Sequence, residues 1–372
     1  MAARFPIEAS ELRGQTFSCL EGCGFCCLCQ PGLSVAERGR FRGPLREAVA
    51  PGGDALRIVG QAGPCALLSR ERACTQYDLR PRGCRSFPYH TTLSWRAQVN
   101  LNRGCPGTWA HGPAAARGFA PAEALPPARE TVEALRAAQA AWRAFARQAR
   151  AASVYEPPAR VRARLRACAP LLRTERGLAA GLALAEAGLP VGPRALRAGL
   201  GEARVEALHG FLEEQARATF GQQDAKRLPI FVDADDGFRW LAFRLRGDAL
   251  ERLAITPAGA LQPRGEQPLA PLPLLARDAG AERLFAAHAG VVVERDLLYG
   301  LAAFMLDRLG YGEPFASAAL RELCAALGDL WVRAGFLARF DGDVALDGRA
   351  MARGVGFFDM DFLNAPTIGV AF

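Results

Sequence analysis

The chain has 372 residues, half of them apolar, and a formal net charge of +8. That length suffices for one large domain or two ordinary ones with a substantial core, which excludes an intrinsically disordered chain. No apolar run reaches the ~18 residues of a membrane-spanning helix, and the first residues lack the apolar segment of a secretory signal. We therefore expect a cytoplasmic protein without membrane association, in a compartment that keeps thiols reduced.

The basic residues are almost all arginine, and Lys226 is the only lysine in the sequence. The arginines are spread along the chain, and no basic tract with interleaved aromatic residues occurs. Proteins that bind single strands without sequence preference combine such tracts with stacking aromatics. We therefore expect that nucleic acid is not a partner, and that the protein acts on or binds another protein or a small molecule.

Cysteine is concentrated in the first third of the chain. Nine of the eleven cysteines lie between residues 19 and 105, and Cys168 and Cys324 stand apart. An odd count and a reducing compartment both argue against disulfides, and a single reactive thiol would not need so many neighbours. Metal binding explains the density, and thiolate ligands favour zinc, copper(I) or an iron–sulfur cluster over hard cations.

The densest stretch reads Cys19-x3-Cys23-x2-Cys26-Cys27, with Gly22 and Gly24 among the cysteines. The glycines free the backbone to fold around a centre. In an extended segment neighbouring side chains point in opposite directions. We therefore expect the last cysteine of this loop to serve a second centre, or to close the first from another side.

Four more cysteines follow at wide spacing and must be gathered by folding. Eight thiolates would make two four-ligand sites or one larger cluster, and paired zinc-finger spacings are not matched. Whether Cys29 or His90 is a further ligand stays open. The eight predicted metal ligands are Cys19, Cys23, Cys26, Cys27, Cys65, Cys74, Cys84 and Cys105.

Basic and aromatic residues accompany the downstream cysteines. Arg80 and Arg85 lie near predicted ligands, where guanidinium charge would offset the negative charge of a thiolate-bound centre, with simple solvent exposure as the alternative. We expect Tyr77 and Phe87 to form a small core around the site rather than to react.

These residues together resemble the YkgJ family of cysteine-cluster proteins, which are described as zinc- or iron-chelating domains. The resemblance covers about residues 17–106 and implies a metal-binding module there. It does not extend to residues 160–372. The matching positions are Cys19-x3-Cys23-Gly24-Phe25-Cys26-Cys27, Pro64-Cys65, Cys74-x2-Tyr77-x2-Arg80-Pro81-x2-Cys84-Arg85-x-Phe87-Pro88, and the later Cys105.

In size and layout the chain also resembles flagellin lysine N-methylase, in which a similar cysteine cluster holds a [4Fe–4S] centre beside a helical region. That likeness implies a protein-modifying, methylase-like enzyme, with S-adenosylmethionine as a possible cofactor.

A third pattern has to be weighed. Cys19, Cys23, Phe25 and Cys26 also match the C-x3-C-x-aromatic-C signature of radical S-adenosylmethionine enzymes. Those enzymes place the loop after a first barrel strand and continue with alternating strands and helices. Here the loop follows a short N-terminal segment and precedes a loop-rich, cysteine-studded stretch, so we do not expect that barrel.

A stretch rich in proline, glycine and alanine follows the last clustered cysteine and reads as a linker. It leads into a predicted helix over 128–152, whose apolar residues recur at helical spacing. Arg136, Arg143, Arg147 and Arg150 fall elsewhere on that helix and are interpreted as a solvated face, with a phosphate-binding stripe as the alternative.

The rest of the chain is predicted to be mainly helical, with helices over about 159–180, 193–219, 281–309 and 314–339. Residues 228–245 approach strand alternation around a DADDG turn, and 252–262 form a second predicted hairpin. Cys168 and Cys324 lie beside leucines on apolar faces and are interpreted as core thiols.

Aspartates form three groups in the C-terminal half, each in a turn-like stretch or beside glycine, and turn chemistry is the simplest interpretation. Catalytic or hard-metal use is the alternative. The groups are Asp233, Asp235 and Asp236; Asp341, Asp343 and Asp347; and Asp359 and Asp361.

The predicted fold class is α+β: a small, loop-rich, metal-stapled N-terminal module (1–112), a linker with a helix (113–157), and a mainly α-helical domain with a small antiparallel β-element (158–372). An iron–sulfur cluster is preferred over zinc because the three-cysteine loop with its adjacent cysteine suits a cluster. Three hypotheses remain: an enzyme that modifies a protein or small molecule, a non-catalytic zinc module with a helical partner-docking domain, and an electron-transfer protein. No catalytic residue is identified.

Overall fold

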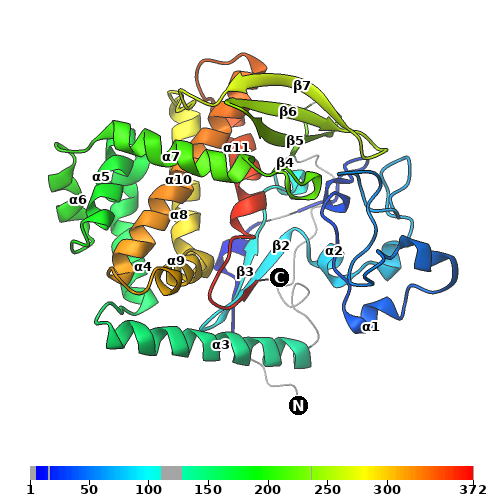
Figure 1. Cartoon of the computed structure of the whole chain (residues 1–372), viewed down its shortest axis with the longest axis horizontal. Coiled ribbons are helices and arrows are strands. Elements are labelled where there is room, and N and C mark those ends of the chain that lie inside the picture. The colour runs from blue at the N-terminus through cyan, green and yellow to red at the C-terminus, as the bar shows by residue number, and fades with distance from the viewer. Residues whose placement is uncertain (1–5, 16, 110–127, 236, 372) are drawn as a thin grey trace.

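The computed structural model describes residues 6–15, 17–109, 128–235 and 237–371. It confirms the α+β class, with helices on one side, a cysteine-rich module on the other, and two small sheets (Figure 1). The predicted linker lies mainly in residues 110–127, outside the described residues. The predicted boundaries at 112 and 157 stay predictions. No described helix is long and apolar enough to cross a membrane.

The cysteine-rich module is loop-rich, as predicted, but it contains a sheet that the sequence did not indicate. Its strand order is β1-β3-β2-β8, with β1 parallel to β3 and the other pairs antiparallel. The last strand comes from the C-terminal end of the chain, so the two ends of the sequence meet in one sheet. The elements are β1 (Ile7–Glu8), α1 (Val35–Arg38), α2 (Arg82–Ser86), β2 (Tyr89–Leu93), β3 (Ala97–Leu101) and β8 (Val370–Ala371).

The two faces of the β2–β3 hairpin join the module to the helices. Leu93 and Ala97 lie on one face and pack against Leu135 and Ala138 of α3 (Ala128–Ala151). Gln98 lies on the other face, because neighbouring strand residues alternate, and its side chain donates to the Glu294 carbonyl at 2.9 Å. Polar and apolar contacts thus hold the module on the helical part from both sides.

The predicted helices 128–152 and 314–339 are confirmed as α3 and α10 (Phe315–Asp341). Each of the three other predicted helices is divided into two in the structure. The helix expected over 159–180 ends near Pro170, and a new one starts after Thr174, whose side chain accepts a hydrogen bond from the Gly177 amide at 3.0 Å. The helix expected over 193–219 breaks around Gly199. The helix expected over 281–309 breaks at Arg295, which is in an extended conformation. The helices are α4 (Pro158–Cys168), α5 (Glu175–Glu186), α6 (Pro193–Gly199), α7 (Val205–Phe220), α8 (Ala279–Glu294), α9 (Asp296–Arg308), α10 (Phe315–Asp341) and α11 (Gly348–Phe362).

Helix α11 was not predicted, since glycines interrupt its sequence pattern. Gly354 lies where α11 contacts α10. A Cβ at this position would lie 2.4 Å from the Ala334 Cβ, so only glycine lets the two helices approach this closely. Asp359 and Asp361 therefore lie in a helix and not in turns, which corrects the expectation for that pair.

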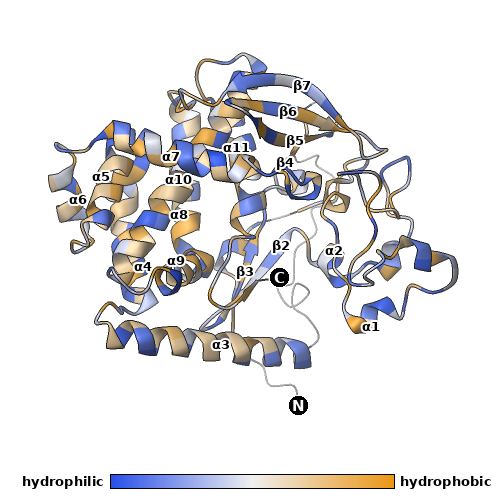
Figure 2. Ribbon diagram, viewed as in Figure 1, coloured by the Kyte–Doolittle hydropathy of each residue, from blue (hydrophilic) through white to orange (hydrophobic). Residues whose placement is uncertain are grey.

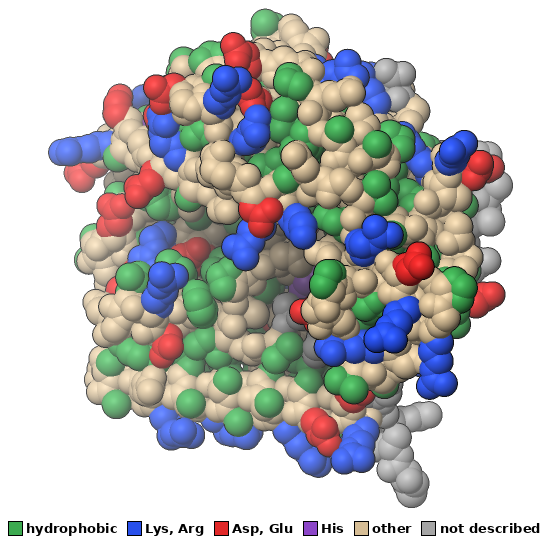
Figure 3. Space-filling view, turned by 45° about the vertical axis from the view of Figure 1, so that its right-hand side comes forward, with side chains coloured by type: hydrophobic (Ala, Val, Ile, Leu, Met, Phe, Trp, Pro, Cys, Tyr) green, Lys and Arg blue, Asp and Glu red, His purple; other side chains and the backbone are tan. Residues whose placement is uncertain are grey.

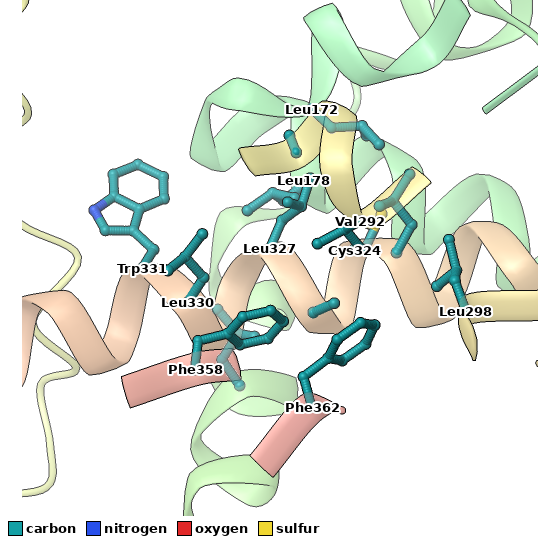
Figure 4. Close-up of a cluster of buried hydrophobic side chains, with 14 of the residues drawn as sticks. Leu172, Leu178, Val292, Leu298, Cys324, Leu327, Leu330, Trp331, Phe358 and Phe362 are labelled. Atoms are coloured by element: carbon teal, nitrogen blue, oxygen red, sulfur yellow. The ribbon is translucent and has the colours of Figure 1, made fainter. Parts of the chain in front are cut away.

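The hydrophobic core is built around α10, which is buried along most of its length. Figure 4 shows Leu172 and Leu178 on one side of α10, and Phe358 and Phe362 of α11 on the other. Cys168 and Cys324 are fully buried in this core, which confirms their interpretation as core thiols.

The two predicted hairpins join into one antiparallel sheet of order β4-β5-β6-β7. Its outer strand β7 is exposed and largely hydrophilic (Figure 2). The opposite end of the sheet order, β4, contacts α11. The strands are β4 (Ile230–Asp233), β5 (Arg239–Arg246), β6 (Ala249–Ile255) and β7 (Leu261–Pro268).

Candidate metal centre

The loop that carries the first cysteines is a tight turn. Gly22 and Gly24 have φ values of +72° and +58°, in the left-handed region that glycine adopts without strain. Phe25–Cys27 form a single 3₁₀ turn. The segment is therefore not extended, and Cys26 and Cys27 line the same cavity. This position suits the expectation that Cys27 closes the first centre from another side, and the ligand assignment itself stays a prediction.

Apolar contacts hold this loop on the β4–β7 sheet. Cys23 and Phe25 are buried in one cluster with Trp240, Leu253 and other residues of β4, β5 and β6. The Trp240 indole donates to the Cys23 carbonyl at 2.8 Å. The sheet thus supports the cysteine loop from beneath.

Folding gathers three of the four widely spaced cysteines, Cys65, Cys74 and Cys84, at one cavity. A cavity of about 340 Å³ lies between the first loop and the segment 65–84. The Cys65 amide donates to the Cys27 carbonyl at 2.7 Å, which joins the two segments directly. Six of the eight predicted ligands line the cavity: Cys19, Cys26, Cys27, Cys65, Cys74 and Cys84.

The other two predicted ligands do not line the cavity. Cys23 is buried beneath the loop, and Cys105 precedes a short 3₁₀ turn, Pro106–Thr108. Burial raises the pKa of Cys105 well above its usual value, and the charges of Cys23, Cys26 and Cys19 raise it further. Cys105 therefore interacts electrostatically with the thiols of the first loop, although it does not line the cavity.

The chemistry of the donor set fits a thiophilic metal, because six cysteine sulfurs from both segments line this cavity, more than the two carboxylates, Glu21 and Glu71, that line it as well. Within the described part of the chain, no three His, Cys, Asp or Glu side chains stand close enough together to hold one ion. The thiols surround a space and do not converge on one point.

Burial keeps most of these thiols protonated. It raises the pKa of Cys23 to about 12, and it does the same for Cys84 with help from neighbouring thiols. Cys26 differs, because a hydrogen bond with the Cys27 side chain lowers its pKa to about 7 against the effect of burial, with a smaller contribution from Arg80. Metal binding at these thiols would therefore release protons.

Two arginines border the cavity, one of which the sequence did not indicate. Arg80 was predicted, and its charge lowers the pKa of Cys26. Arg72 was missed, although it lies between two cysteines in the sequence. It stacks on Trp240 at 4.3 Å and donates to the Phe238 carbonyl at 2.7 Å. Arg85 is exposed on α2.

The two aromatic residues of the downstream motif have different positions. Phe87 is half-buried and packs in the cluster beneath the loop, as predicted. Tyr77 is 52% exposed, and the Arg80 guanidinium lies over its ring at 3.5 Å. The expectation that Tyr77 belongs to a small core is therefore wrong.

The two open candidates lie outside the cavity. Cys29 is exposed and does not line it. His90 is buried on β2, where burial, and then the charge of Arg295, lower its pKa to about 4. Its surroundings are Arg295 and Asp359, and neither belongs to the cysteine cavity.

Two of the predicted aspartate groups meet in the fold and line a second cavity of about 380 Å³. Arg353 lies among them and donates to Asp341 at 2.5 Å and to Asp233 at 3.4 Å. Turn and cap roles are confirmed for part of the set, since Asp347 caps α11. Asp236 lies outside the described residues. The aspartates that line the cavity are Asp233, Asp235, Asp341, Asp343 and Asp347.

Comparison with known proteins agrees with the position of this centre. Residues 18–106 match the family model CxxCxxCC, described as a "putative zinc- or iron-chelating domain". The cysteine-cluster resemblance is thereby confirmed for that stretch. No curated protein and no solved structure matches the chain.

Proposed function

Starting from a cysteine-cluster domain of the zinc- or iron-chelating kind at residues 18–106, we propose that this domain holds an iron–sulfur cluster. The observation that carries the proposal is the cavity of about 340 Å³ lined by six cysteines. Tetrahedral zinc requires four donors within about 2.0–2.3 Å of one ion. A cluster has several iron atoms, each with its own thiolate, and suits sulfurs that surround a space.

The walls of the cavity support this assignment. Phe41, Leu56 and Leu68 supply apolar surface, which limits the access of water and thereby tunes a bound centre. Arg72 and Arg80 supply positive charge against thiolates. A bound cluster would supply electron transfer, or an iron atom with an open position for a cofactor.

The helical part favours an enzyme over an isolated metal module. The cysteine loop rests on the β4–β7 sheet, and Trp240 and Arg72 join the loop, the sheet and the downstream cysteine segment. These contacts would hold a metal centre in the cavity at a fixed position relative to the β4–β7 sheet. We therefore infer a protein-modifying, methylase-like activity, for which S-adenosylmethionine is the cofactor to test.

The first experiment is anaerobic purification followed by iron, sulfide and zinc analysis, with absorption and EPR spectra. The expected result is about four iron and four sulfide per chain and a broad absorption band near ~400 nm. Stoichiometric zinc without sulfide would contradict the cluster and support the alternative, a non-catalytic zinc module with a helical docking domain.

Variants identify the ligands. Cys74→Ser and Cys84→Ser are expected to lose the cluster, since both thiols line the cavity. Cys168→Ala is the matched control, because that thiol is buried in the helical core and is expected to retain full metal content. Equilibrium dialysis of S-adenosylmethionine against the loaded protein tests the enzymatic part separately.

A further inference from the structure

Helix α3 presents a line of arginines to solvent. Arg136, Arg143, Arg147 and Arg150, here named the arginine stripe, are all exposed. At 3.6 residues per turn, spacings of seven, four and three bring all four onto one side of the helix, over about 21 Å of its length. Figure 3 shows basic side chains gathered along the lower edge of the molecule, over α3.

No carboxylate on the same helix balances this charge. The acidic residues of α3 are Glu130 and Glu133, both near its N-terminal end. Among the described residues, Arg136, Arg143 and Arg147 have no ion-pair partner, whereas Arg150 lies over the Tyr155 ring at 4.2 Å. The stripe is therefore a positively charged edge, without ion pairs at three of its four arginines in the described part of the chain, on a protein whose formal net charge is already +8.

The opposite face of α3 packs the helix onto the rest of the protein, so Arg136, Arg143 and Arg147 are not needed to hold the helix in place. Leu135, Ala138, Trp142 and Phe145 are buried against the β2–β3 sheet and the helical core. The helix is thus held rigidly while its outer arginines point to solvent. The packed helix fixes the spacing of the four arginines along its axis, so binding to a regular array of opposite charges requires only their side chains to be ordered.

The chemistry of the stripe selects the kind of anion. A guanidinium group forms paired hydrogen bonds with phosphate oxygens. The exposed residues between the arginines are Ala137, Ala140, Ala141 and Gln148. They include no bulky apolar side chain to enter a bilayer and no aromatic ring on which a base could stack.

We propose that the arginine stripe docks the sugar–phosphate backbone of duplex nucleic acid, without reading its sequence. Charge complementarity carries the assignment, since contacts to phosphates position a protein on a duplex and give no sequence information. This proposal takes up the alternative interpretation of these arginines and departs from the sequence-based expectation about nucleic acid, because the structure shows that all four are exposed.

Salt dependence of duplex binding tests the proposal. The full chain, purified with its metal, is titrated with a fluorescent DNA duplex of about 20 base pairs at ~50–200 mM KCl. Four phosphate contacts predict a slope of log K against log salt between about −3 and −4. The variant R136Q/R143Q/R147Q is expected to flatten that slope by about 3 and to weaken binding at low salt about tenfold or more.

A charge-matched control separates the stripe from net charge. R194Q/R197Q/R283Q removes three exposed arginines from α6 and α8 and is expected to leave the slope within about one of wild type. Glutamine has nearly the helix propensity of arginine, and circular dichroism checks that each variant is folded.

Three results would overturn the proposal: no duplex binding by the wild-type protein at the lowest salt, an equal loss in both triple variants, or binding to anionic lipid vesicles but not to the duplex. None of these results depends on which metal the cysteines hold, so this proposal and the proposed function can fail independently.

Discussion

The Trp240 indole donates a hydrogen bond to the Cys23 carbonyl at 2.8 Å, although 217 positions separate the two residues in the sequence. Both are buried, and Cys23 belongs to the loop that carries half of the predicted metal ligands. This hydrogen bond joins the loop of the first four predicted ligands to the β4–β7 sheet.

Replacing Trp240 with Phe is expected to loosen metal binding. The variant keeps an aromatic side chain but leaves the Cys23 carbonyl unpaired, which costs about 1–3 kcal/mol. Transfer of the metal to a competing chelator should be faster by about tenfold. Trp331→Phe is the control, because Trp331 makes the same kind of bond, to the Leu275 carbonyl at 2.9 Å, in the helical core. Equal release rates for the two variants would contradict the prediction.

Gly22 and Gly24 offer a matched pair that separates backbone strain from crowding. Both have positive φ, so alanine at either position should lower the free energy of unfolding by about 1–2 kcal/mol. A Cβ at Gly24 would also lie 3.0 Å from the Trp240 ring, whereas one at Gly22 meets nothing within 4 Å. We expect Gly24→Ala to be the less stable variant in urea unfolding. Equal losses would show that the contact with Trp240 does not matter.

Asp359 is expected to be essential for stability. It is fully buried, and Arg295 donates to it through two nitrogens at 2.7 and 3.1 Å. Burial alone would raise the pKa of Asp359, but the charges of Arg295 and His288 hold it well below its usual range. Asp359→Asn removes one of the two carboxylates that pair with the buried Arg295, the other being Glu11, and should cost about 3 kcal/mol of unfolding free energy.

The exposed Asp343 supplies the control for that variant. Asp343→Asn is expected to change the free energy of unfolding by less than about 0.5 kcal/mol, as surface substitutions do. A loss below about 1 kcal/mol for Asp359→Asn would show that the buried pair contributes little.

His90 is expected to make the protein acid-sensitive. Its folded pKa of about 4 lies below the value of about 6.5 for an unfolded chain. Between these values the unfolded chain binds the extra proton, so stability is full above pH ~6.5 and falls as the pH drops towards ~4. The loss from pH ~7 to pH ~5 is about 2 kcal/mol.

Unfolding in urea at the two pH values measures this loss. His90→Gln should remove it, and His209→Gln should retain it, because His209 is an exposed residue of α7. An unchanged pH dependence in His90→Gln would contradict the assignment.

Periodicity and spacing are local properties, and they predicted the features that depend on local structure. The helices α3 and α10 follow from apolar residues at helical spacing, and the two β-hairpins follow from alternation around turns. The cysteine density, the glycines of the first loop and the downstream motif predicted a metal-binding module over about residues 17–106, and residues 18–106 match a family model described as zinc- or iron-chelating.

The errors arose where a distant contact decided the local structure. No local pattern predicted α11, which depends on the close approach of Gly354 to Ala334. Arg72 is held at the edge of the cysteine cavity by stacking on Trp240. Asp233 and Asp341 lie together because Arg353 donates hydrogen bonds to both. None of these pairs is adjacent in the sequence, so no local pattern could indicate them.

The sequence by itself determined which chemistry is present: soft thiols in number, arginines near them, and a chain apolar enough to bury a core. Only the tertiary structure decided where that chemistry acts. Six thiols face one cavity and Cys23 lies beneath the loop, because apolar burial on the β4–β7 sheet fixes the loop's orientation. Side-chain type is encoded residue by residue, whereas direction and neighbourhood arise from packing between segments far apart in the chain.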